Sequence, residues 1–155
     1  MGTKDKAEYY LNLAKEASRA SSCLRSHFGA VIVKNDMIIG IGYNGPARGV
    51  PHCNPCRREN DPPGVGYDKC PAVHAEANAI IQSGGRQGCL GATLYMGSHN
   101  RRYNGTKYNE GMGDFPCSNC ARLIINAGIE YVVQMELIEP VVYHIPTLIK
   151  EGKLW

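Results

Sequence analysis

Hydrophobic periodicity divides the first third of the chain into one helix and two strands. Asp5 and Glu8 have the spacing of a capping box, and apolar residues recur after them at helical spacing. This pattern predicts a helix over residues 5–20. Residues 28–45, FGAVIVKNDMIIGIGYNG, contain two apolar runs separated by a turn at 34–36. We expect them to form a β-hairpin.

Shorter periodic segments alternate in the rest of the chain. The pattern predicts a short helix in 72–85, a strand at 92–96, a helix at 116–128, a strand at 129–135 and a helix from about residue 146. The second helix is stopped by two glycines, and the third has a proline at its start and a glycine past its end. The resulting order is α β β α β α β α.

This order indicates an α/β fold in a single domain spanning residues 1–155. Helices that alternate with strands imply parallel pairing in the second half, whereas the first two strands pair antiparallel. We therefore expect a mixed sheet of about five strands with helices on both faces, a three-layer α-β-α arrangement.

Two long polar segments interrupt the periodic pattern, at residues 44–72 and 97–115. The first is rich in proline and glycine, and it predicts an irregular loop. Loops of such length in a compact domain are usually functional or held in place by other groups.

Composition excludes several classes of protein. The 155 residues are 43% hydrophobic and 20% charged, as in globular domains. The net charge of +3 fits an anionic small ligand and is too weak to indicate nucleic acid. No apolar run is long enough to span a membrane, and the N-terminus lacks the apolar core of a signal peptide. We expect a cytoplasmic protein that binds neither nucleic acid nor membranes.

Seven cysteines are the most unusual feature of the composition. Disulfides are rare in a reducing cytosol, so clustered cysteines indicate metal binding or catalysis. Two C-x-x-C pairs are present, in HCNPC at 52–56 and PCSNC at 116–120.

One of these pairs combines with a histidine and a glutamate into a catalytic constellation. His74 and Glu76 open one predicted helix, and Cys117 and Cys120 open another. One nitrogen and two thiolates leave the fourth tetrahedral position of zinc open, as in catalytic sites. Glu76 is then free to transfer protons to and from a zinc-activated water. The alternative is a structural zinc site, but no fourth ligand lies close by in the sequence.

The residues HAE at 74–76 and PCSNC at 116–120 match the signature H-x-E…P-C-x-x-C. The chain thus resembles the zinc-dependent cytidine deaminase superfamily. Residues 21–33, 42–53, 74–80 and 124–133 further resemble the deoxycytidylate (dCMP) deaminase family. The resemblance implies a cytidine-deaminase-like fold and hydrolysis of dCMP to dUMP and ammonia. Zinc-activated hydroxide would attack C4 of cytosine, with Glu76 as the proton shuttle.

The resemblance also implies three contacts with the substrate. The N–H of Ala75 would donate to the pyrimidine O2, and Asn44 would contact the sugar and base. Arg25 is the candidate for the 5′-phosphate, because a guanidinium suits bidentate phosphate binding. Its alternative is a surface arginine.

Regulation and assembly follow only by analogy. Many members of the family are homo-oligomers, hexamers among them, that are activated by dCTP and inhibited by dTTP. The segment GYNG belongs to their effector site, which implies Tyr43, Asn44 and Gly45 here.

The remaining cysteines suggest a second, structural zinc. Some members of the family carry one, and Cys23 and Cys53 fall at positions that match its ligands. With Cys56 and Cys70 they would complete a four-thiolate site that keeps the loop at 44–72 ordered. His52 is an alternative ligand. Cys89 is left over and is expected in the core.

The segment 97–115 departs from the family, which passes almost directly from strand to helix here. It contains Arg101, Arg102, Tyr103, Lys107 and Tyr108, a mixture that suits gripping a phosphate or stacking a base. A solvated loop or a subunit contact is the favoured interpretation.

Two rival functions remain open from the sequence. One is deamination of another cytosine or purine nucleobase, nucleoside or triphosphate. The other, of a different class, is a non-catalytic zinc-binding module in which both C-x-x-C pairs are structural. The position of Glu76 argues against the second.

Overall fold

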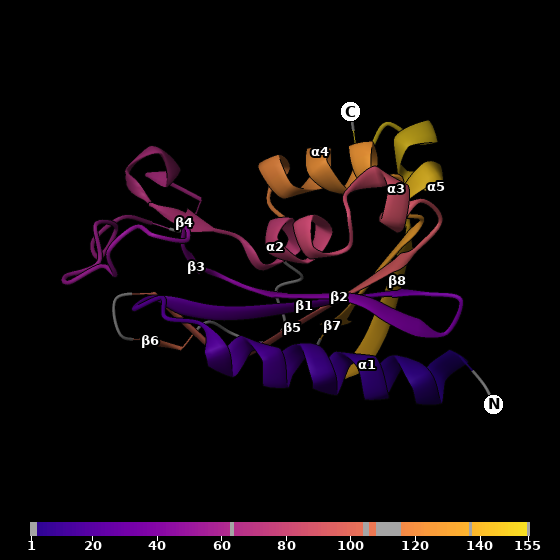
Figure 1. Ribbon diagram of the computed structural model, residues 1–155, viewed down its shortest axis with the longest axis horizontal. Coiled ribbons are helices and arrows are strands. Elements are labelled where there is room, and N and C mark those ends of the chain that lie inside the picture. The colour runs from indigo at the N-terminus through magenta and orange to yellow at the C-terminus, as the bar shows by residue number, and fades with distance from the viewer. Residues whose placement is uncertain (1–2, 63, 104–105, 108–115, 137, 155) are drawn as a thin grey trace.

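A mixed β-sheet forms the centre of the protein (Figure 1). The structure is a computed structural model and describes residues 3–62, 64–103, 106–107, 116–136 and 138–154. The strands lie in the order β2 (Met37–Tyr43), β1 (Ser26–Lys34), β5 (Thr93–Tyr103), β7 (Tyr131–Glu136) and β8 (Glu139–His144), and β6 (Thr106–Lys107) pairs with β5. The short strands β3 (Gly45–Pro46) and β4 (Ala72–Val73) pair separately.

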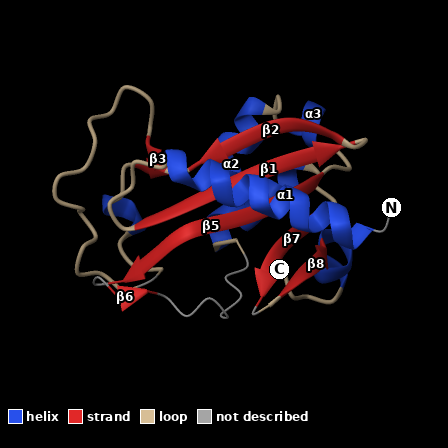
Figure 2. Ribbon diagram, turned by 90° about the horizontal axis from the view of Figure 1, so that it is seen from below, coloured by secondary structure: helices blue, strands red, loops and turns tan. Residues whose placement is uncertain are grey.

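Helices cover both faces of the sheet, which confirms the predicted three layers. α1 (Thr3–Ala17), followed by the 3-10 turn η1 (Ser18–Ala20), lies across one face (Figure 2). α2 (Ala75–Gln82), α3 (Arg86–Cys89), α4 (Ser118–Ala127) and α5 (Ile145–Lys150) lie on the other (Figure 1). The turn η2 (Tyr67–Lys69) lies in the long loop before β4. None of the helices in the described part of the chain is long and apolar enough to cross a membrane.

Strand pairing agrees with the sequence pattern. β1 and β2 form an antiparallel hairpin. Its turn contains Asn35 and Asp36 with φ of 50° and 62°, the positive values that tight hairpin turns require. β5 and β7 pair parallel, with Thr93 opposite Tyr131. β1 pairs antiparallel with β5 and so joins the hairpin to the parallel pair.

Two details of the predicted sheet were wrong. β8 was not predicted, because its six residues begin Glu-Pro, and a proline weakens the strand signal of a short run. Proline is tolerated there because β8 is an edge strand that pairs with β7 alone in the main sheet. Residues 97–103 were predicted as loop but continue β5, since β1 pairs with them as far as Arg101.

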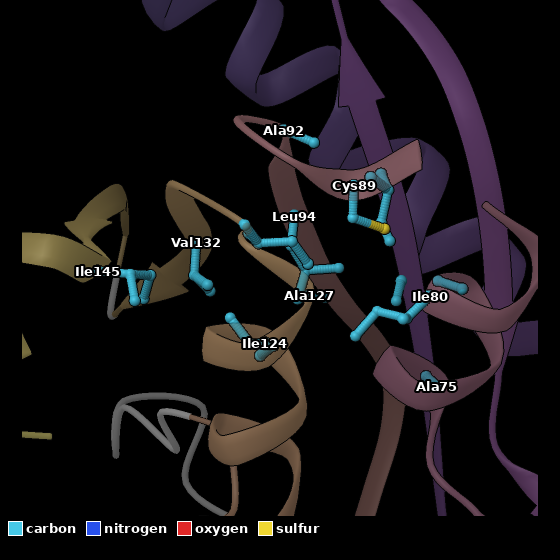
Figure 3. Close-up of a cluster of buried hydrophobic side chains, with 13 residues drawn as sticks. Ala75, Ile80, Cys89, Ala92, Leu94, Ile124, Ala127, Val132 and Ile145 are labelled. Atoms are coloured by element: carbon cyan, nitrogen blue, oxygen red, sulfur yellow. The ribbon is translucent and has the colours of Figure 1, made fainter. Parts of the chain in front are cut away.

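The hydrophobic core lies mainly between the sheet and the helices α2 to α5 (Figure 3). Ile32 and Leu94 from the sheet and Ile124 from α4 are fully buried there. Cys89 is also fully buried, as predicted. The opposite face buries Tyr10 and Ala14 of α1 against Val31 and Val33 of β1, with Ala7, Leu11 and Val133 adjoining.

Gly42 sets the position of α2 on the sheet. A Cβ at this residue would lie 2.2 Å from the carbonyl oxygen of Ala75 and 2.5 Å from the amide nitrogen of Ala79. Both are backbone atoms of α2, so they cannot move aside without moving the helix. The absence of a side chain at Gly42 therefore allows the start of α2 to approach β2.

We expect Gly42→Ala to destabilise the protein by about 1–3 kcal/mol, the usual cost of overpacking. Chemical denaturation monitored by circular dichroism measures this change. Gly45→Ala is the control, because a Cβ there would meet only the Ser22 hydroxyl, at 3.0 Å, and the Ser22 amide nitrogen at 3.9 Å. Equal losses for the two variants would contradict the close approach of α2.

Candidate active site

His74 stands at the start of α2. It is the N-cap residue, with extended backbone angles of −72° and 156°, and it follows directly on β4. The side chain is therefore carried at the N-terminal end of the helix. Glu76 follows in the first turn of the same helix and is only 6% exposed.

Cys117 and Cys120 occupy the equivalent end of α4. Cys117 is the N-cap and Cys120 lies one turn further along, so both thiols are on the same side of the helix start. Pro116 precedes the cap rather than opening the helix as predicted. Gly128 ends the helix with φ of 75°, the left-handed C-terminal conformation that the sequence indicated.

The packing of α2 against α4 brings the three side chains together. His74 Nδ1 lies 3.4 Å from Cys117 Sγ and 3.3 Å from Cys120 Sγ. All three donor atoms lie within 4.8 Å of one another. Tetrahedral zinc with normal bond lengths holds nitrogen and sulfur ligands about 3.6 Å apart. The donor set therefore fits one zinc ion without rearrangement of the helices.

The electrostatics favour a thiolate in this group. A hydrogen bond with Cys120, aided by His74, lowers the pKa of Cys117 to about 4. The same hydrogen bond, together with burial, raises the pKa of the Cys120 thiol. The hydrogen bond to Cys117 raises the pKa of His74. The N-terminus of α4 adds a positive partial charge beside Cys117.

Glu76 is a buried carboxyl group beside the metal donors. Burial raises its pKa above the usual value. Its carboxyl group interacts with the Cys120 thiol, so it lies beside one of the three metal donors. A carboxyl group whose pKa is raised holds a proton more readily than an exposed one, which suits it to receive a proton and release it again.

Two predicted substrate contacts lie close to this group. Ala75 is the first residue of α2 and is fully buried, and the N–H groups of a first turn have no acceptor within their own helix. Asn44 is 7% exposed, and its amide group bridges the backbone of β1. Its Oδ1 accepts from Phe28 N at 2.8 Å, and its Nδ2 donates to Ser26 O at 2.9 Å. A sugar contact would have to use the remaining lone pair or hydrogen of this amide.

Arg25 is engaged with the long loop. Its Nη1 donates to the carbonyl oxygen of Arg58, and its Nη2 donates to that of Asp61 at 2.6 Å. These bonds tie the start of β1 to the middle of the segment 44–72. The role of Arg25 at the 5′-phosphate stays a prediction, and phosphate binding there would compete with two backbone carbonyls.

The residues of the predicted effector segment follow β2. Tyr43 is 39% exposed at the end of that strand, whereas Gly45 is buried in β3. The carbonyl oxygen of Tyr43 accepts from Asn78 Nδ2 at 2.8 Å, which links the segment to α2. Binding of an effector here stays a prediction.

The four other clustered cysteines line one small cavity of about 20 Å³: Cys23, Cys53, Cys56 and Cys70. All are free thiols and partly buried. In the described part of the chain, His74, Cys117 and Cys120 form the one group whose donors lie within 4.8 Å. The four sulfurs share a pocket but would have to be drawn closer to hold one ion. His52, the alternative ligand, is exposed.

Sequence reasoning missed two residues beside the metal donors. The ring of Tyr67 packs edge-on against His74, with 5.5 Å between centroids. The guanidinium carbon of Arg58 lies 4.2 Å from the centroid of the Tyr67 ring. The arginine pair in CRREN was the available signal, but no spacing relates it to the HAE motif.

The basic and aromatic residues of the segment 97–115 cannot be placed in this site. Residues 104–105 and 108–115 lie outside the described residues, and so do the side chains of 101–103 and 106–107. The structure therefore does not test the prediction for the basic and aromatic residues of this segment. They are Arg101, Arg102, Tyr103, Lys107 and Tyr108.

Comparison with known proteins places this geometry in a family. Residues 4–136 match the family described as "Cytidine and deoxycytidylate deaminase zinc-binding region". The deoxycytidylate deaminase of Mycobacterium phage D29 is 39% identical over 140 residues, which cover 86% of this chain and 96% of that protein. The human deoxycytidylate deaminase is 35% identical over 134 residues, which cover 83% of this chain and 63% of that protein.

A solved structure agrees with these matches. The dCMP deaminase of cyanophage S-TIM5, in complex with dCMP and dUMP, superposes with a TM-score of 0.59 at 26% identity and covers 86% of this chain and 82% of that chain. The chain spans nearly the whole of the phage D29 relative but less than two thirds of the human one. With its His74, Cys117 and Cys120 group inside the matched region, this chain belongs to the cytidine and deoxycytidylate deaminase family.

Proposed function

We propose that the protein is a zinc-dependent enzyme that hydrolyses dCMP to dUMP and ammonia. The observation that carries the proposal is a buried carboxyl group, Glu76, beside three side chains whose donor atoms fit zinc. Relatives named deoxycytidylate deaminase that align over most of this chain support the choice of substrate. The family match to a zinc-binding region supports the choice of metal.

His74, Cys117 and Cys120 would hold the ion. When bound, zinc supplies Lewis acidity that lowers the pKa of a coordinated water. The three protein ligands leave a fourth position for that water, as catalytic zinc sites require.

Glu76 moves the protons of the reaction. Attack of water on C4 of cytosine requires that one water proton be transferred to N3 of the ring. The second water proton must then be transferred to the amino group, which departs as ammonia and leaves the C4 carbonyl. A single carboxyl group beside the donors can perform these transfers in turn, and burial keeps bulk water from competing for its proton.

The remaining contacts position the pyrimidine. The Ala75 N–H, at the positive end of α2, is suited to the O2 carbonyl of the base. Asn44 would contact the sugar, and Arg25 is retained as a candidate for the phosphate. These three assignments rest on the family resemblance.

Ammonia release from deoxycytidine, dCMP and dCTP tests the proposal. We expect the highest kcat/KM with dCMP and release of one ammonia per dUMP formed. Preference for another substrate would keep the chain in the family but would remove dCMP as its substrate. Absence of deamination with any pyrimidine or purine would favour a non-catalytic zinc-binding role.

The four cysteines of the small cavity support a further part of the proposal, a second, structural zinc. Four thiolates would close the coordination of the ion and tie the segment 44–72 to the start of β1. We expect two zinc ions per chain by atomic absorption and one in Cys56→Ser, with the loop then more susceptible to proteolysis. Cys89→Ala is the control, because this buried cysteine lies outside the cavity. One zinc per chain in both the original protein and Cys56→Ser would contradict the second site.

The proposal also covers assembly and regulation, for which the support is the family resemblance. A homo-oligomer, a hexamer among the possibilities, with dCTP and dTTP acting at Tyr43, Asn44 and Gly45, follows from the family alone. A cytoplasmic location is likewise inferred from the sequence. Sedimentation with and without each nucleotide tests the assembly.

A further inference from the structure

Arg58 is a buried cation within the long loop. The residue is 8% exposed although it lies between exposed neighbours. Its Nε donates to the carbonyl oxygen of Val65 at 2.7 Å, and its guanidinium stacks on the Tyr67 ring. The loop thus folds back on the arginine and fixes the plane of the guanidinium.

This cation has no carboxylate partner among the described residues. Asp61, three residues further along the loop, has its carboxylate paired with Lys69, with 3.0 Å between Oδ2 and Nζ. The contacts of Arg58 are a carbonyl oxygen and an aromatic face, neither of which neutralises its charge. A charge taken out of water without a counter-ion is costly, so the binding of an anion at this arginine would be favourable.

The position of Arg58 relates it to the active site. Tyr67 contacts Arg58 with its face and packs against His74 in a T-shaped arrangement. The distance from the guanidinium carbon of Arg58 to the centre of the His74 ring therefore cannot exceed the sum of these two distances, 4.2 Å and 5.5 Å. A nucleoside monophosphate spans a comparable length from its base to its phosphorus. A ligand whose base lies at the metal donors can thus place its phosphate near Arg58.

We propose that Arg58 binds the 5′-phosphate of the substrate and so makes the site select a nucleoside monophosphate over a nucleoside. This inference rests on the proposed function and adds a residue that determines its specificity. Tyr67 orients the guanidinium, and Arg25 fixes the backbone behind it by donating to the carbonyl oxygen of Arg58. Arginine is suited to the role, because its planar fork can donate two parallel hydrogen bonds to a phosphate.

The test compares Arg58→Gln with Arg57→Gln in the zinc-loaded enzyme. Arg57 is the adjacent residue, is exposed, and gives the same change of charge. We expect Arg58→Gln to lower kcat/KM for dCMP roughly 10–100-fold, mainly through KM, since a hydrogen bond to a charged group is of that strength. Turnover of deoxycytidine should change less than about threefold, and Arg57→Gln should leave both substrates unchanged.

A binding measurement provides a readout other than activity. Isothermal titration calorimetry of the zinc-loaded protein with dUMP and with deoxyuridine reports the phosphate contribution directly. Arg58→Gln should remove most of the difference between the two ligands. If Arg58→Gln does not fold, Arg58→Lys is the second variant, because it retains the charge but lacks the planar guanidinium group. We expect it to show an intermediate loss of dUMP affinity.

Three results would overturn the inference. Equal losses with dCMP and deoxycytidine would make Arg58 a structural residue of the loop. Loss of zinc from Arg58→Gln with unchanged substrate preference would assign it to the neighbouring cysteine cavity, which it also lines. Loss of dCMP preference in Arg25→Gln but not in Arg58→Gln would make Arg25 the phosphate ligand. If the original protein deaminates nothing, the proposed function itself fails, whatever Arg58 does.

Discussion

Glu76→Gln is expected to abolish deamination while leaving the zinc site intact. The amide has the shape of the carboxyl group but cannot accept and return a proton. General acid–base catalysis contributes about 10²–10⁴-fold to rates, and Glu76 serves more than one proton transfer in the proposed reaction. We therefore expect kcat with dCMP to fall at least about 10³-fold. A coupled assay of ammonia release measures the change.

The fold should tolerate this substitution, which separates chemistry from stability. Burial already disfavours the charged form of Glu76, as its raised pKa indicates. A neutral amide therefore loses little folding free energy, and the melting temperature should stay within a few degrees. Glu130→Gln is the matched control, because Glu130 is on the surface, 43% exposed in its side chain, and pairs with His144. Activity of Glu76→Gln close to that of Glu130→Gln would exclude Glu76 as the proton shuttle.

The sequence predicted the core of the site because its motifs coincide with helix starts. HAE and PCSNC each stand at the start of a helix, and both helices lie on the same face of the sheet (Figure 1). Parallel pairing of β5 and β7 follows from the helix between them. These features are local or depend on chain order, which periodicity and spacing report directly.

Contacts made by the irregular loop could not be predicted in the same way. Arg25 and Arg58 are 33 residues apart, and a backbone carbonyl accepts the hydrogen bond that joins them. Carbonyl groups occur at every residue, so no residue type marks this partner. Asn44 was predicted to contact the sugar and base, and no sequence signal indicated that its amide also holds two backbone groups of β1. β8 was missed because a six-residue edge strand with proline at its second position lacks a clear pattern.

Removal of one zinc ligand is expected to have a comparably large effect on activity. Cys117→Ser is the most informative change, because Cys117 is the N-cap of α4 and serine is a preferred N-cap residue. The helix should therefore keep its start while the metal loses a thiolate. Lewis acidity contributes several kcal/mol to such reactions, so activity should fall about 10³-fold or more. Zinc content should fall by one ion per chain.

The controls for this prediction separate metal loss from loss of a thiol. Cys89→Ala removes a cysteine that is fully buried in the core and should retain both zinc and activity, with a modest loss of stability. Added zinc should restore the chelator-treated original protein but not Cys117→Ser at the same concentration. Retention of the full zinc content and activity by Cys117→Ser would contradict the assignment, because the donor set would then have lost one of its three members without consequence. The reaction would in that case have to be carried by groups other than the His74, Cys117 and Cys120 site.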